Sequence, residues 1–93
     1  MTKLIARVHT DQETIERLKA LQVELDGEMA AELHLVDGRV LRGVLPERPS
    51  VMQFVDASGQ EGTNGILRFD AADGEIHLLL LDEVDRVVRL GSA

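Results

Sequence analysis

The chain has 93 residues, of which 44% are hydrophobic and 29% charged, and its net charge is −7. This length and balance predict a single globular domain, residues 1–93, with one small core. The absence of cysteine excludes disulfides and thiolate metal sites. The acidic charge and the presence of only two aromatic residues, Phe54 and Phe69, weigh against nucleic-acid binding, because phosphates are repelled and few rings are present to stack on bases.

The amino terminus contains only a short apolar run, Leu4–Ala6, before Arg7. This run is too short for the core of a signal peptide, and no other stretch approaches the length of a membrane span. We therefore expect a cytoplasmic protein that does not enter a membrane.

A helix is predicted over residues 11–26. Thr10 and Glu13 have the spacing of a capping box, and Gly27 is a suitable stop because glycine adopts a left-handed conformation without strain. Four apolar residues recur at helical spacing on one face: Ile15, Leu18, Leu21 and Leu25. We expect this face to pack on the protein's own sheet, with a partner-binding face as the alternative.

After Gly27 the pattern changes to short strands. Ala31, Leu33 and Leu35 alternate with polar residues, and Asp37-Gly38 predicts a two-residue hairpin turn. Gly43 lies inside the next strand and indicates a bend. Further strands are predicted in "SVMQFVD", "GILRFD", "EIHLLLL" and "RVVRL". The expected fold is mainly β with one N-terminal helix, the strands forming a small, strongly bent antiparallel barrel of five to six strands over residues 29–90.

Three segments carry a resemblance to known proteins. The segment "AELHLVDGRVLRGVL" resembles the first half of an Sm-like motif, and "LLLLDEVDRVV" resembles its end. With "GQEGTNGILRFD", the whole pattern is similar to a family of short, uncharacterised proteobacterial proteins, a domain of unknown function with a variant Sm-like barrel. The resemblance implies an Sm-like fold over nearly the whole chain.

The resemblance does not carry RNA binding with it. Sm proteins bind uridine-rich RNA partly through an Asp-x-x-x-Asn signature, and the corresponding positions here are Arg48 and Met52. Their second Sm element ends with Arg/Lys-Gly, whereas this chain has Leu81-Asp82-Glu83. No RNA-contacting residue can be transferred, and a shared fold does not supply a function.

Three glycines, Gly59, Gly62 and Gly65, recur in a segment that predicts a nine-residue loop over 57–65. The segment lacks the Lys-Ser/Thr and the following helix of a phosphate-binding loop. We expect Asn64-Gly65 to supply positive φ before a strand. Since long loops often bind ligands, we predict a ligand or partner site from four polar residues: Arg48, Gln53, Asn64 and Arg68.

The remaining chemistry is sparse. His9, His34 and His77 lack the spacing of a metal site, and the acidic turn at 82–85 is interpreted as solvated. No serine has a histidine or lysine patterned as its base. We therefore expect no metal, no cofactor and no enzymatic activity.

Four consecutive leucines interrupt the expected alternation of a half-buried strand, so both of its faces are apolar. Either the helix covers the second face or a second subunit does. We predict a homo-oligomer, a dimer rather than a large ring, with its contact at Ile76, Leu78, Leu79, Leu80 and Leu81.

The function expected from the sequence is a non-catalytic Sm-like module for self-association or for binding an unknown protein partner. Two alternatives stay open: an RNA-binding Sm relative with a displaced site, and a small-molecule binder.

Overall fold

The computed structural model describes residues 3–92. None of its helices is long and apolar enough to cross a membrane, within the residues described. Within these residues the chain forms one α-helix, a short 3₁₀ helix (η1) and a set of strands. Their bounds are β1 Lys3–Leu4, α1 Gln12–Glu24, β2 Met29–Leu35, β3 Val40–Leu45, β4 Ser50–Val55, β5 Glu61–Ala71, β6 Ile76–Leu80, η1 Leu81–Glu83 and β7 Val84–Ser92.

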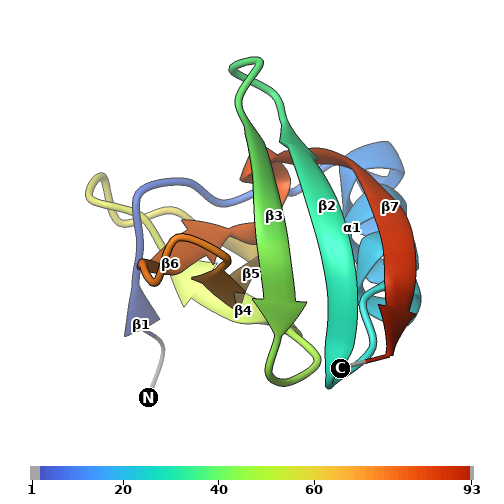
Figure 1. The fold of residues 1–93 in the computed structure, drawn as a ribbon. Helices are drawn as coiled ribbons and strands as arrows, with labels where there is room; N and C mark the ends of the chain where they lie inside the picture. The colour runs from blue at the N-terminus through green and yellow to red at the C-terminus, as the bar shows by residue number, and fades with distance from the viewer. Residues whose placement is uncertain (1–2, 93) are drawn as a thin grey trace.

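The strands form one curled sheet in the order β1-β4-β5-β3-β2-β7, with β6 attached to β5. Figure 1 shows β3, β2 and β7 side by side as one wall, and β4, β5 and β6 as the other. All pairings are antiparallel except that of the two-residue β1 with β4. The predicted fold class, a mainly β, strongly bent antiparallel sheet after one helix, is confirmed, and the sheet forms a half-barrel.

Strands β3 and β4 lie along the same edge of β5. Gly43 pairs with Ala71 near the end of β3, and Ser50 pairs with Ile66 at the start of β4. At Gly43 an added Cβ atom would lie 2.1 Å from the carbonyl oxygen of Asp70. The glycine predicted to mark a bend is therefore the point where the backbone of β5 comes close to β3.

The helix begins and ends differently from the prediction. Its N-cap is Asp11 rather than Thr10, because the Asp11 carboxylate accepts a hydrogen bond of 2.9 Å from the backbone N–H of Thr14. The helix ends at Glu24 with Leu25 as its cap, before the predicted boundary at residue 26. Gly27 does not have positive φ; the left-handed residue is Glu28, at φ 58°.

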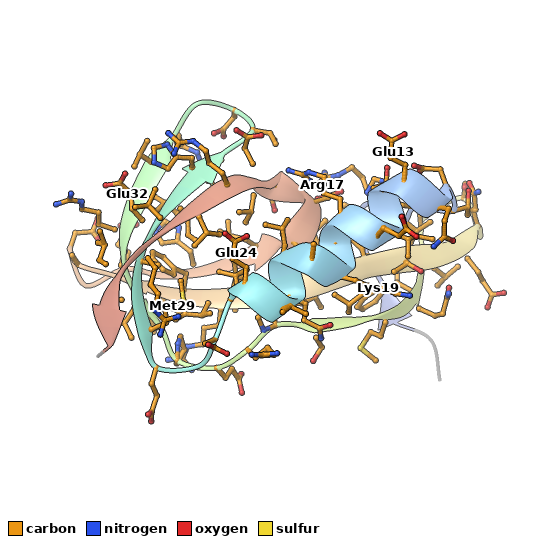
Figure 2. The ribbon with its side chains drawn as sticks, turned by 90° about the vertical axis from the view of Figure 1, so that its right-hand side faces the viewer. Glu13, Arg17, Lys19, Glu24, Met29 and Glu32 are labelled. Carbon is orange, nitrogen blue, oxygen red and sulfur yellow. The ribbon has the colours of Figure 1, made fainter. Side chains whose placement is uncertain are left out.

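The apolar face of α1 packs on the sheet, as predicted. Leu18, Leu21 and Leu25 are buried in the same core cluster as Leu79 and Leu81. Figure 2 shows the helix lying across the curled sheet. The helix thus closes one side of the half-barrel and covers the inward leucines of the run at 78–81.

The first hairpin also has a longer turn than predicted. Leu35 and Arg39 are joined by a backbone hydrogen bond of 2.9 Å, which leaves three residues, 36–38, in the turn. Gly38 has φ 93°, but Asp37 does not have positive φ. The turn therefore needs the left-handed conformation at one position only, and glycine occupies it.

The prediction of a nine-residue glycine loop over 57–65 is wrong. β5 begins at Glu61, and a tight turn closed by the bond from Asp56 N–H to Gln60 O precedes it. Only Gly59 needs a left-handed conformation, at φ 87°. Positive φ at Asn64-Gly65 is likewise not found, because both residues lie inside an extended strand.

The other two glycines of this segment allow close approaches. A Cβ atom at Gly62 would lie 2.8 Å from the carbonyl oxygen of His9. At Gly65 it would lie 2.8 Å from the carbonyl oxygen of Ser50 and 2.9 Å from the Cβ of Leu81. These glycines therefore make room for chain segments that are distant in sequence.

Candidate interaction surface

Residues 3–9 form a strap that crosses the hairpin of β4 and β5. β1 pairs with β4 at Phe54 and Val55, and His9 then pairs with Thr63 of β5 through two backbone hydrogen bonds of 2.9 and 2.8 Å. The strap crosses at Gly62, where any side chain would collide with it. Its pairing with β4 and β5 holds these N-terminal residues on the outside of the half-barrel before the chain enters α1.

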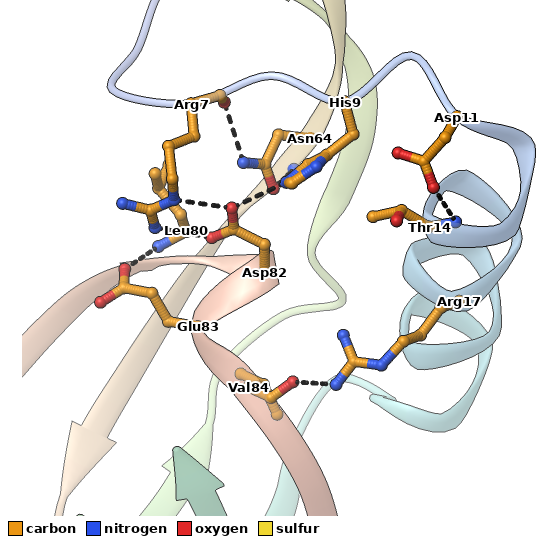
Figure 3. A network of polar contacts seen from close by, with 11 residues as sticks. Arg7, His9, Asp11, Thr14, Arg17, Asn64, Leu80, Asp82, Glu83 and Val84 are labelled. Carbon is orange, nitrogen blue, oxygen red and sulfur yellow. Dashed lines mark hydrogen bonds and ion pairs between the residues drawn. The ribbon is translucent and has the colours of Figure 1, made fainter. Parts of the chain in front are cut away.

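A polar network fastens the strap to η1 (Figure 3). The Asp82 carboxylate accepts hydrogen bonds of 2.8 and 2.7 Å from Arg7, and its Oδ2 lies 2.9 Å from Nε2 of His9. Burial of Asp82 acts to raise its pKa, but the hydrogen bonds from Arg7 and His9 outweigh that effect and hold the pKa below its ordinary value. Asp82 is therefore a structural anion that ties two segments together.

The neighbouring polar groups are also engaged within the protein. Glu83 accepts a hydrogen bond of 2.7 Å from the backbone N–H of Leu80, and Arg17 donates one of 2.8 Å to the carbonyl oxygen of Val84. Beside them lies a hollow of about 430 Å³, lined in part by Arg7 and His9. Since these charged groups bond to one another or to the backbone, the hollow offers little unpaired charge to a ligand.

No cluster of histidine and acidic residues in the described range 3–92 has the arrangement of a metal site. The three histidines lie apart, each near a different carboxylate: His9 near Asp82, His34 near Glu32, and His77 near Glu75.

The four residues predicted to form a ligand site do not converge. Asn64 is fully buried, donating 3.0 Å to the carbonyl oxygen of Arg7 and accepting 2.8 Å from the N–H of Gly65. Gln53 bonds to Thr63 at 3.3 Å and borders a separate hollow beside α1. Of the four, only Asn64 was predicted to lie in the loop over 57–65, and it lies instead within β5 beneath the strap.

Arg48 and Arg68 do border one hollow. Arg48 forms an ion pair with Asp26, and Arg68 bonds to Asp70 at 3.1 Å. This hollow, about 300 Å³ in volume, is called the β4–β6 hollow below. Its lining is Glu47, Arg48, Pro49, Ser50, Met52, Phe54, Ile66, Arg68 and Leu78.

The β4–β6 hollow has apolar walls because alternate residues of each strand face it. Met52 and Phe54 come from β4, Ile66 from β5 and Leu78 from β6. Phe54 is buried, whereas Met52 is 50% exposed and Leu78 is 74% exposed. Met52, Phe54 and Ile66 were not among the residues predicted to form a ligand site. The alternation in "SVMQFVD" was a usable signal for the first two.

The leucine run is divided between two environments. Leu79 and Leu81 are buried in the core, Leu80 is half-buried, and Leu78 and Ile76 are exposed. β6 pairs with β5 along one edge, and no strand within residues 3–92 pairs with its other edge. The outward side of β6 thus combines an open strand edge with exposed apolar side chains.

The family model for a domain of unknown function, DUF3247, matches residues 2–90. The chain belongs to the DUF3247 family. The resemblance noted in the sequence is therefore confirmed, and the family match extends over both the helix and the strands.

A solved structure supports the same assignment for this DUF3247 chain. The protein XC5848 from Xanthomonas campestris is 31% identical, with 95% of this chain and 97% of that chain covered and a TM-score of 0.86. Its crystal structure is described as adopting a novel variant of the Sm-like motif. No curated protein is similar enough to count as a match. The DUF3247 chain thus has the variant Sm-like fold predicted from its sequence.

Within this Sm-like fold, the positions of the Sm RNA signature lie beside the β4–β6 hollow. Arg48 lies in the turn before β4, and Met52 lies on β4 with its side chain half exposed. The segment Leu81–Glu83, in place of an Arg/Lys-Gly pair, forms η1 and carries the carboxylates of the polar network. These acidic groups have structural partners, and none offers the positive charge that an RNA phosphate needs.

Proposed function

We propose that this DUF3247 protein is a non-catalytic module for protein interaction that associates with itself, most simply as a dimer, through the outward side of β6. The observation that supports the proposal is the exposure of Leu78, at 74%, beside a hollow that is partly apolar. Burial of a leucine side chain contributes about 1.5–3 kcal/mol. A protein that covered Leu78 and its neighbours would therefore gain stability from surface that is now in water.

Burial within the protein's own core limits which residues the proposed contact can use. Leu79 and Leu81 belong to the protein's own core, where Leu18 and Leu21 of α1 and its cap Leu25 share the same cluster. The outward residues Ile76 and Leu78, with the half-buried Leu80, are left for a second subunit. The helix therefore accounts for two of the leucines and leaves the others uncovered.

The absence of catalysis is part of the proposal. The polar side chains around Asp82 are engaged in bonds that hold the strap and η1 in place. A general base or a nucleophile would need a partner aimed at a substrate position. In this network the hydrogen-bonding groups point at one another and at the backbone.

Sedimentation velocity over a range of micromolar concentrations tests the proposal. We expect the wild-type chain to sediment as a dimer and Leu78→Ser to sediment as a monomer. Val23→Ser is the matched control, since Val23 is also apolar and is 68% exposed, but lies on α1. A wild-type chain that stays monomeric throughout would overturn the proposal.

A further inference from the structure

The β4–β6 hollow and the protruding Leu78 lie next to each other on the same face of the protein. Leu78 forms one wall of the hollow and exposes 74% of its surface, while Phe54 inside the hollow is only 1% exposed. We propose that a second copy of this chain docks on this face about a two-fold axis, with Leu78 of each copy seated in the β4–β6 hollow of the other. This inference rests on the self-association proposed above.

The shape of the face supports a symmetric contact. In a two-fold dimer the same patch meets itself, so a protrusion must be matched by a depression on the same surface. Leu78 and the hollow are such a pair, because they are adjacent and the lining of the hollow includes the apolar side chains of Met52, Phe54 and Ile66. At about 300 Å³, the hollow exceeds the space of several water molecules of about 30 Å³ each and can admit a leucine side chain.

The distribution of charge also favours this face as the contact between two copies. Two copies that each carry a net charge of −7 repel one another over most of their surfaces. The rim of the β4–β6 hollow has two arginines, Arg48 and Arg68, and one acidic residue, Glu47. Both arginines are already paired with carboxylates, Asp26 and Asp70, so this face is close to electrically balanced.

Other exposed apolar residues lack this combination. Val23 precedes Glu24 on α1, and Val36 precedes Asp37 in a hairpin turn. Neither residue lines the β4–β6 hollow. Among the exposed large apolar residues of the described range, Met52 and Leu78 alone line this hollow, so this face combines exposed apolar side chains with a depression.

A different arrangement would join the open edges of two β6 strands. In that dimer the backbones pair, Leu78 lies beside its counterpart on a continuous sheet, and the hollow takes no part. The two arrangements differ in one respect that can be measured: only the docked arrangement requires the hollow to be open.

Two complementary variants test the docked arrangement. Leu78→Ala removes the protrusion and leaves Met52, Phe54 and Ile66 in place around an open hollow, whereas Met52→Trp fills the hollow and keeps Leu78. Each variant alone should weaken the dimer by at least about tenfold in dissociation constant, equivalent to about 1.4 kcal/mol. An equimolar mixture should recover association as a heterodimer, because Leu78 of the Met52→Trp copy can enter the open hollow of the Leu78→Ala copy.

Thermal melting of each variant checks that it folds, and Ser50→Tyr, at an exposed position on the rim, is a second way to fill the hollow. Fluorescent labelling of one variant allows the heterodimer to be followed by sedimentation. A mixture that stays as weak as its components would overturn the inference. So would a dimer that Met52→Trp and Ser50→Tyr both leave intact, although self-association itself would then stand. A monomeric wild-type chain would overturn both proposals.

Discussion

Asp82 in η1 binds Arg7 of the strap through two hydrogen bonds, of 2.8 and 2.7 Å, between residues at opposite ends of the sequence. The same carboxylate lies 2.9 Å from His9. Its side chain is only 9% exposed, although that of Arg7 is 51% exposed. One partly desolvated carboxylate thus fastens the N-terminal segment to the end of β6.

Replacing Asp82 by Asn should destabilise the protein by about 1–3 kcal/mol, because the amide keeps the size of the side chain but cannot accept both bonds from Arg7. Asp85→Asn is the matched control, since the Asp85 side chain is 62% exposed and its nearest approach to Arg17 is 4.0 Å. That variant should stay within about 0.5 kcal/mol of wild type. Urea denaturation followed by circular dichroism measures both, and equal effects would contradict the role given to Asp82.

The same carboxylate should make stability depend on pH in acid. The folded-state pKa of Asp82 is held below its ordinary value, so the unfolded state binds protons more readily than the folded state. The stabilisation is complete above the ordinary pKa, about 3.9, and is lost as the pH falls through the folded-state value. Plots of the free energy of unfolding against pH, measured by denaturation between pH 7 and pH 2, should therefore fall more steeply for wild type than for Asp82→Asn. Parallel curves would show that other carboxylates dominate.

Gly43→Val should lower the free energy of unfolding by more than about 1 kcal/mol. An added Cβ would lie 2.1 Å from the carbonyl oxygen of Asp70 and 2.7 Å from Cα of Ala71, so the pairing of β3 with β5 would have to shift. Gly27→Ala is a suitable control, because its nearest contact would be at 3.4 Å and its φ is not positive. An unchanged melting temperature for Gly43→Val would remove the close-approach argument.

No measurable binding to uridine or adenosine oligomers is expected at physiological salt. The chain has a net charge of −7 and two aromatic residues, and Arg48 and Arg68 each bond to a carboxylate. Fluorescence anisotropy with labelled oligomers tests this. Micromolar binding that weakens steeply with added salt would instead favour a displaced RNA site, and loss of that binding in Arg48→Ala would locate it.

Local patterns in the sequence were sufficient to predict most of the helices and strands of the fold. The alternation of Ala31, Leu33 and Leu35 with polar residues predicted β2, and these residues are buried in turn along that strand. The spacing of Leu18 and Leu21 likewise predicted the buried face of α1. Such patterns can be read from the chain because each depends on residues only a few positions apart.

The structure of the glycine segment and of the candidate surface could not be predicted from local patterns, because both depend on contacts between segments that are distant in sequence. Gly62 lies under His9, and Gly65 lies against Ser50 and Leu81, so these glycines resembled a loop although they belong to β5. Asn64 was expected in a ligand site but holds the strap, because its amide meets the carbonyl oxygen of Arg7. Residue alternation was enough to predict which strand faces are apolar. Only the curling of the sheet decided that α1 covers Leu79 and Leu81 while Leu78 stays exposed beside a hollow, because burial depends on which distant segments reach each face.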